Sequence, residues 1–276
     1  MPTLEDHVYS DVLVVGNGFD LDLGLPTSYN DFLGSNQFES LERSGNNFAH
    51  HLRSVQQDQR WVDIEIELAM YSEYAATAYE TTDFLREYQG LCRALSDYIS
   101  CLDYDLINKN SRAATVLAGI ATDAKELCVE NFNYSRSLEI LLPRGPSVNV
   151  IQVHGAAARR NIVFGVHDAA EITKDHIFLR KSAAPAFFDD CLISDILKNA
   201  YQSVTVFGHS LGQSDHTQFR EFFNPIQNKK ESKIQIHYHS ETSYYDLMQQ
   251  IETMSAAKLL KFRTMHDFHM TGPQFS

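Results

Sequence analysis

The chain has 276 residues, of which 43% are hydrophobic, and its formal net charge is -13. This length and composition allow one large domain, or one domain with an inserted lobe, to bury a sizeable core. The negative charge disfavours a broad nucleic-acid surface or a contact with anionic lipid. Any nucleotide that binds is expected to be held mainly by backbone amides.

The start of the chain carries Glu5, Asp6 and Asp11, so it lacks the basic opening and apolar core of a signal peptide. No apolar run reaches the length that spans a membrane, and a cytoplasmic location is the expectation. The cysteines form no C-x-x-C pair, which argues against a zinc ribbon and favours buried free thiols. They are Cys92, Cys101, Cys128 and Cys191.

The first predicted element is a strand over Val12–Val15, because valines on either side of a leucine are typical of a strand buried on both faces. Gly16 and Gly18 follow it and permit a sharp turn that a ligand can approach closely. A helix that begins there would direct unpaired N–H groups at an anion, so a diphosphate could bind without a lysine. Pro26 prevents a regular helix from continuing and favours a loop that covers the ligand.

A long helical pattern with few glycines and no proline extends from about Phe38 to Lys125. We interpret residues 38–125 as an inserted helical lobe, and residues 1–37 with 126–276 as the core. A short helix before the lobe is expected to begin at a cap provided by Thr27 or Ser28.

One segment of this lobe, residues 61–68, combines a tryptophan with alternating acids. Trp61 is expected to anchor the core of the lobe together with Ile64 and Leu68. The roles of the acids Asp63 and Glu65, and of Asp215 further along the chain, remain open.

Strand patterns return in the second half of the chain, and most of them end at glycine or small polar residues. The predicted strands cover residues 126–130, 148–153, 203–207 and 233–238, with a short apolar segment at 162–166 and a helix near 187–199. Strands that alternate with helices predict an α/β fold with a doubly wound parallel sheet. Ligands of such sheets bind at the carboxyl ends of the strands. These ends carry the first glycine turn, Asn133, His154, the Gly208 turn and Ser240.

Taken together, these positions resemble the signature of sirtuin-like NAD-binding domains. The glycine turn, an asparagine motif similar to T-Q-N-x-D, His154-Gly155, Ile162-Val163-Phe164-Gly165 and a G-x-S-L segment follow in the expected order. The resemblance implies a Rossmann-like core that binds NAD+, with no metal assigned to the site.

A second resemblance spans nearly the whole chain, from Val12 to at least Asp215. The segments that carry it are Gly16-Asn-Gly-Phe-Asp, Gly24-Leu-Pro-Thr-Ser-Tyr, Trp61-x-Asp-Ile-Glu, Phe132-Asn-Tyr, His154-Gly, Phe164-Gly and Gly208-His-Ser-Leu-Gly-x-x-Asp. They resemble the bacterial abortive-infection AbiH family. This resemblance implies phage defence through damage to the metabolism of the host cell.

Two departures from the sirtuin pattern affect the expected chemistry. Sirtuin deacylases carry a four-cysteine zinc module between the histidine-glycine pair and V-x-F-G, whereas here only residues 156–161 intervene. The resemblance therefore implies hydrolysis of the dinucleotide rather than deacylation. In addition, Asp20 stands where sirtuins carry serine, and Ser135 stands where they carry aspartate.

The resemblance assigns roles to thirteen residues. His154, with a pKa near its ordinary value, is expected to act as a base on a ribose hydroxyl or on water, and Asn133 to orient either group. The diphosphate and the nicotinamide ribose would contact Gly16, Asn17, Gly18, Phe19 and Asp20. The adenosine would contact Gly208, His209, Ser210 and Leu211, with His239 and Ser240 nearby.

Two other functions fit parts of the sequence. Gly208-His-Ser-Leu-Gly matches the nucleophile elbow of serine hydrolases, for which Asp246 with His266 or His269 could complete a triad. A nucleotide sensor that binds without cleavage would use the same pocket. The helical insertion is a candidate surface for self-association of the chain.

Overall fold

The computed structural model describes residues 8–58, 62–142, 148–185, 190–200, 202–226 and 231–273, with no side chains described at 190–192. Within these residues, six strands form one parallel sheet in the order β3-β2-β1-β4-β5-β6. The strands are β1 (Asp11–Val15), β2 (Leu127–Asn131), β3 (Val148–Gln152), β4 (Ser203–Phe207), β5 (Lys233–His237) and β6 (Asp267–Thr271). The same strand order is found in dinucleotide-binding folds. The predicted α/β fold with a parallel sheet is confirmed.

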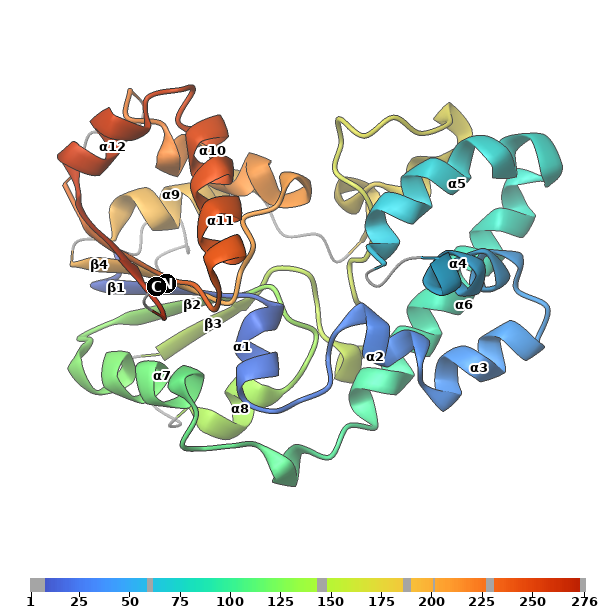
Figure 1. Ribbon diagram of the computed structural model, residues 1–276, viewed down its shortest axis with the longest axis horizontal. Coiled ribbons are helices and arrows are strands. Elements are labelled where there is room, and N and C mark those ends of the chain that lie inside the picture. The colour runs from blue at the N-terminus through green and yellow to red at the C-terminus, as the bar shows by residue number, and fades with distance from the viewer. Residues whose placement is uncertain are drawn as a thin grey trace.

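Helices cover both faces of the sheet (Figure 1). On one face, α1 (Asn17–Asp22), α7 (Arg112–Asp123) and α8 (Ser137–Leu141) contribute to a core with Leu13 and Val15. On the other face, Val12 and Val14 share a core with four further helices. These are α9 (Asp190–Asn199), α10 (His216–Phe223), α11 (Glu241–Met254) and α12 (Leu259–Met265). As predicted, β1 is buried on both faces.

A separate helical lobe lies beside the sheet (Figure 1). It contains α2 (Tyr29–Leu33), α3 (Asn36–Arg43), α4 (Asn47–Asp58), α5 (Ile64–Ala78) and α6 (Thr81–Ser100). Short 3-10 turns η3 (Ala157–Arg159), η4 (Lys174–Leu179) and η5 (Lys181–Ala183) come between β3 and α9, and Phe164 and Leu179 of this segment belong to the hydrophobic core of the lobe. Trp61 lies outside the described residues.

The hydrophobic clusters divide the chain differently from the predicted boundaries of the lobe. Ala113, Ala114 and Leu117 of α7 pack on the sheet, although they fall within residues 38–125. Conversely, residues 157–179, which lie far outside that range, supply part of the core of the lobe. The lobe is therefore assembled from two separate stretches of the chain. No helix in the described ranges combines the length and apolar character that crossing a bilayer requires.

Two local predictions differ from the structure. Segment 148–153 is not a fully buried strand, because β3 lies at the edge of the sheet and its residues other than Ile151 are at least partly exposed. The short apolar segment at 162–166 contributes an isolated bridge between Val166 and Arg180. Of the cysteines whose side chains are described, Cys128 is buried and Cys101 is exposed.

Two glycine-containing loops meet at the carboxyl end of the central strands. The loop after β1 and the loop after β4 are joined by the Gly18 N–H, which donates to the carbonyl of Gly208 at 2.8 Å. A Cβ on Gly16 or Gly18 would lie within 2.7 Å of the backbone of His209 or Gly208. Gly208 itself has a φ of 69°. These glycines are therefore required by the contact between the loops, independently of any ligand.

Replacement of Gly208 by alanine tests this contact. The left-handed backbone alone costs about 1–3 kcal/mol in a residue other than glycine, and the new Cβ would lie 2.1 Å from the nitrogen of Phe19. We expect Gly208→Ala to lower the free energy of unfolding in urea by at least that amount. The control Gly119→Ala, in α7 with nothing near its Cβ, should raise it by up to about 1 kcal/mol. Equal stability of the two variants would contradict the requirement.

Candidate functional site

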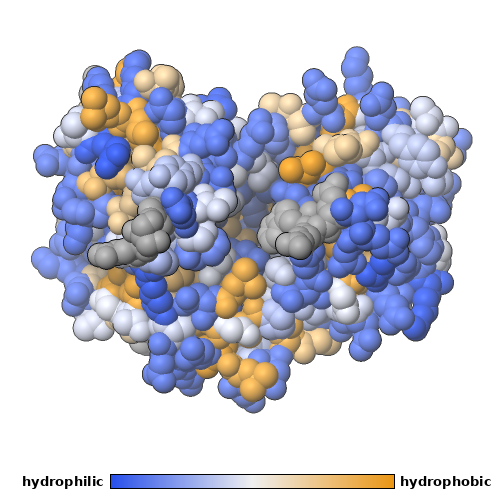
Figure 2. Space-filling model, viewed as in Figure 1, coloured by the Kyte–Doolittle hydropathy of each residue, from blue (hydrophilic) through white to orange (hydrophobic). Residues whose placement is uncertain are grey.

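A cavity of about 650 Å³ lies at the carboxyl ends of the strands, between the sheet and the helical lobe. Figure 2 shows the hollow between these two parts of the molecule. The loops after β1 and β4 both line it, and the order of the sheet reverses between these two strands. Open parallel sheets bind ligands at such a reversal point, and the volume is typical of sites for small molecules.

Eleven of the thirteen residues predicted from the sequence line this cavity. They are Gly16, Asn17, Gly18, Asp20, Asn133, His154, Gly208, His209, Ser210, His239 and Ser240. Phe19 and Leu211 do not line it, because both are fully buried in hydrophobic cores. Phe19 packs edge-to-face against Phe207 at 5.8 Å between ring centroids. The predicted ligand contacts of these two residues are corrected accordingly.

Three backbone amides of the first turn already have partners, whereas the sequence predicted unpaired N–H groups there. The N–H of Gly16 donates to the carbonyl of Phe207, that of Gly18 to the carbonyl of Gly208, and that of Phe19 to the carbonyl of Gly16. A diphosphate could use the amides of Gly16 and Gly18 only if the contact between the two loops were broken. These two amides therefore hold the loops together.

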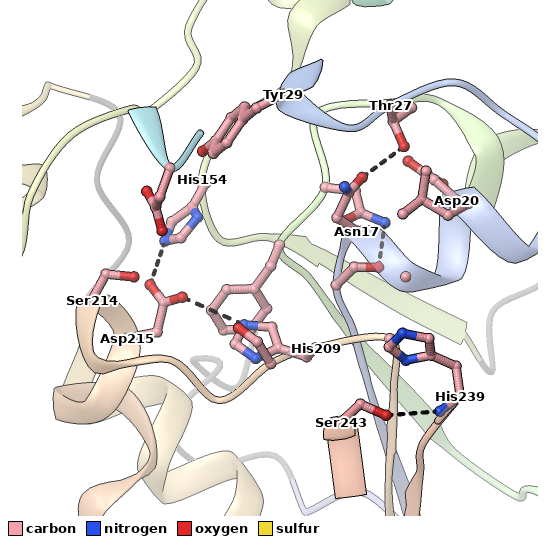
Figure 3. A pocket seen from close by; sticks show the side chains of 18 of the residues that line it. Asn17, Asp20, Thr27, Tyr29, His154, His209, Ser214, Asp215, His239 and Ser243 are labelled. Atoms are coloured by element: carbon pink, nitrogen blue, oxygen red, sulfur yellow. Dashed lines mark hydrogen bonds and ion pairs between the residues drawn. The ribbon is translucent and has the colours of Figure 1, made fainter. Parts of the chain in front are cut away.

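Two amide side chains in the cavity are held in fixed orientations (Figure 3). The hydroxyl of Thr27 donates to Oδ1 of Asn17 at 2.6 Å. Nδ2 of Asn133 donates to the carbonyl of Gly16 at 3.0 Å, and this bond ties the loop after β2 to the loop after β1. Asn17 thus keeps its Nδ2 donors for a ligand, and Asn133 keeps Oδ1 as an acceptor.

Asp20 is a buried carboxyl group in the lining, only 1% exposed. The hydroxyl of Ser137 donates to its Oδ1 at 2.6 Å. Burial raises the pKa of Asp20 to about 6, although hydrogen bonds from Ser137, Ser135 and Asn133 act in the opposite direction. The group therefore changes charge close to neutral pH.

On the other side of the cavity, Asp215 lies between two histidines (Figure 3). Its Oδ1 is 3.4 Å from Nε2 of His154, and its Oδ2 is 3.6 Å from Nε2 of His209. The N–H of Leu211 donates to Nδ1 of His209, so neutral His209 carries its proton on Nε2. Both imidazoles therefore present the same ring nitrogen to one carboxylate.

Lys181 connects Asp215 to the helical lobe. Its Nζ is 3.0 Å from Oδ1 of Asp215 and 3.2 Å from Oε2 of Glu65, and its side chain is 5% exposed. Burial alone would raise the pKa of Asp215. The charge of Lys181, together with the neighbouring His154 and His209, instead lowers this pKa below its ordinary value. Burial raises the pKa of Glu65 to about 7 against the effect of Lys181.

The expectation that His154 has an ordinary pKa is wrong. Burial lowers its pKa to about 3, and the charge of Lys181 acts in the same direction. Burial also lowers the pKa of His209 to about 4. At neutral pH both rings are uncharged hydrogen-bonding groups, and His154 is a weaker base than the sequence predicted.

The far end of the cavity is formed by the loop between β5 and α11. Ser240 lines this end, but its hydroxyl caps α11 by accepting the N–H of Ser243 at 3.1 Å. His239 is exposed, and its backbone N–H donates to the hydroxyl of Ser243. The side chain of Ser240 therefore has a structural task that the sequence alone did not reveal.

The predicted serine-hydrolase triad is not assembled. Ser210 follows the carboxyl end of β4, whereas His266 precedes β6 and therefore lies at the opposite end of this parallel sheet. His269 is paired instead with Asp267, at 2.7 Å. In this turn it is Leu211, not Ser210, that has a positive φ, although the nucleophile elbow strains its serine.

Fold and cavity together define an α/β protein with a ligand pocket at the reversal point of a parallel sheet. The chain also matches the family described as "Bacteriophage abortive infection AbiH" over residues 12–238. It belongs to the AbiH family. No curated protein and no solved structure matched it in the corresponding comparisons.

Lys181, Glu65 and Asp215 are among the lining residues that sequence reasoning left without a role. Glu65 and Asp215 lie in segments that resemble the AbiH family, which was the available signal. Lys181 lies outside these segments, and it reaches the cavity because the preceding η4 packs on the lobe. In the described residues no cluster of histidine, cysteine and acidic side chains forms a candidate metal site.

The raised pKa of Asp20 predicts a pH-dependent effect of its replacement. The folded state binds the proton more tightly than the unfolded state, so a cost arises as the pH rises from about 4 to 6 and remains above that range. We expect Asp20→Asn to increase the free energy of unfolding at pH 8 by up to about 3 kcal/mol and to change it little at pH 4. Denaturant titrations at both values measure this difference. The control Asp123→Asn, at an exposed residue that ends α7, should show no such trend. An equal effect of Asp20→Asn at the two pH values would contradict the prediction.

Proposed function

We propose that this AbiH protein acts in phage defence by hydrolysing NAD+ at the bond between nicotinamide and ribose. One observation carries the proposal: Asp20, Asn133 and His154, which come from three separate strand ends, line a single cavity with the glycine turn. The hydrogen bond from Asn133 to Gly16 brings two of these strand ends into direct contact.

The charges of the cavity favour a substrate that carries a cationic ring. Among the described lining residues are one lysine and five acids: Asp20, Asp63, Glu65, Asp215 and Asp246. Lys181 is already paired with two of these acids. A pyridinium ring on ribose is better matched to such surroundings than the triphosphate of ATP, since opposite charges attract strongly where water is excluded.

The reaction needs few groups. Nicotinamide leaves as a neutral base, so no acid has to protonate it, and positive charge develops on the ribose. The carboxylate of Asp20 would stabilise that charge above its pKa of about 6. Oδ1 of Asn133 would accept a hydrogen bond from a ribose hydroxyl, and neutral His154 would orient the attacking water. The water oxygen bonds to the sugar carbon as the carbon–nitrogen bond breaks, giving ADP-ribose, nicotinamide and a proton that passes to solvent.

Incubation with NAD+, NADP+ and ATP, followed by chromatography, tests this function. We expect nicotinamide and ADP-ribose from NAD+, and a loss of turnover of about 100-fold or more in Asp20→Asn and in His154→Ala. Nucleotide binding by the variants should remain within a few-fold of the unmodified protein. The control His269→Ala, on β6, should retain full turnover.

The alternatives give different results in the same experiment. Binding of NAD+ without release of nicotinamide, together with unchanged NAD+ in phage-infected cells that contain the protein, would identify a sensor. Labelling of Ser210 by a serine-directed phosphonate would instead support the hydrolase that the geometry disfavours.

A further inference from the structure

The lobe and the sheet meet at a buried network of three ionisable side chains. They are Glu65, Lys181 and Asp215. Glu65 belongs to α5 of the lobe, Lys181 to η5, and Asp215 to η6 (Gln213–Asp215) after β4. Lys181 and Asp215 are 5% and 8% exposed as residues, and Glu65 has a side chain that is 15% exposed. A lysine this deeply buried is stable only beside such partners, because an uncompensated charge there costs several kcal/mol.

At one end of this network, Asp215 contacts the imidazoles of His154 and His209 in the cavity. Asp215 Oδ1 lies 3.0 Å from the ammonium of Lys181 and 3.4 Å from Nε2 of His154. Because Lys181 keeps Asp215 ionised, the carboxylate can only accept, and the facing nitrogen of His154 must carry a proton to interact favourably. Nε2 of His154 is buried without a hydrogen bond of normal geometry, and the carboxylate of Asp215 at 3.4 Å is the charged group that it contacts. Nδ1 is then the acceptor of the neutral ring.

We propose that Asp215, held in place by Lys181 and Glu65, is a positioning residue that fixes the tautomer and orientation of His154, and that the helical lobe thereby completes the site. The proposal rests on the proposed function only in assigning His154 a role toward the ligand. A histidine whose proton is fixed on Nε2 accepts a hydrogen bond from water or a ribose hydroxyl through Nδ1 alone. A mixture of tautomers would present a donor to the same group in part of the molecules.

The environment of His154 contains charges of both signs, so the effect of each charge on the pKa of His154 can be tested separately. The groups that act on its pKa are Lys181 from η5, Asp215 from η6 and His209 after β4. Removal of Lys181 removes a repulsion and should raise the pKa of His154. Removal of the charge of Asp215 removes an attraction and should lower that pKa further. These two shifts report only the nearby charges, whereas the tautomer preference of His154 reports the positioning role.

The test follows the ring nitrogens of His154 by ¹⁵N NMR in the full-length protein. We expect neutral His154 with its proton on Nε2, a loss of this tautomer preference in Asp215→Asn, and an upward shift of the pKa of His154 in Lys181→Met, because the repulsion by Lys181 is removed while the burial remains. The ¹⁵N signals of His154 in Lys181→Arg should be the same as in the unmodified protein, because arginine keeps the positive charge. Asp215→Asn should reduce kcat by about 100-fold while KM changes less than about 3-fold.

A matched control is available on α9. Lys198 also contacts two carboxylates, Asp195 at 2.9 Å and Glu221 at 2.6 Å, away from the cavity lining. Lys198→Met should leave the signal of His154 and kcat unchanged. If Lys181→Met does not fold, the tautomer of His154 in the nearly isosteric Asp215→Asn variant is sufficient to test the proposal.

The outcomes separate this inference from the proposed function. Unchanged His154 signals in both Asp215→Asn and Lys181→Met would overturn the positioning role even if NAD+ is hydrolysed. The expected NMR changes in a protein that releases no nicotinamide would support the positioning role and reject the reaction.

Discussion

The contact between the loops after β1 and β4 is the constraint on which the cavity depends. The Gly18 N–H donates to Gly208, and the absence of side chains at Gly16, Gly18 and Gly208 allows the two backbones to touch. Any larger residue would push the loops apart and move Asn17 and His209 away from each other. The glycine turn thus determines the shape of the cavity, and the N–H groups of Gly16 and Gly18 are used in this contact.

Two carboxyl groups on opposite sides of the cavity have different electrostatic surroundings. Asp20 is buried among hydroxyl and amide groups without a cation, so burial raises its pKa to about 6. Asp215 is equally buried but contacts Lys181, so its pKa lies below the ordinary value. Two carboxyl groups of similar chemistry therefore lose their protons in different pH ranges, Asp20 near pH 6 and Asp215 well below it.

Most of the sheet could be predicted from the sequence because β1, β2 and β4 are short apolar runs followed by small residues. β6 was missed, since Phe268 and Met270 alternate with polar residues in a strand at the edge of the sheet. The order of the motifs predicted thirteen site residues, of which eleven line the cavity together with others that the motifs did not indicate. It could not indicate that Phe19 and Leu211 turn into the core, or that Lys181 reaches the cavity, because these outcomes depend on packing between distant segments. The pKa of His154 likewise depends on a neighbour that the linear pattern does not reveal.

The central position of β1 also has a consequence for biosynthesis. Asp11 aligns with Leu127 on one side and with Ser203 on the other, so the first strand to leave the ribosome has no partner until much of the chain has followed. Pairing between such distant segments slows folding and leaves apolar surface exposed to chaperones. The lining of the cavity extends to Leu247, so the cavity can be complete only after that residue has been synthesised. A nascent chain that ends earlier lacks part of the cavity wall.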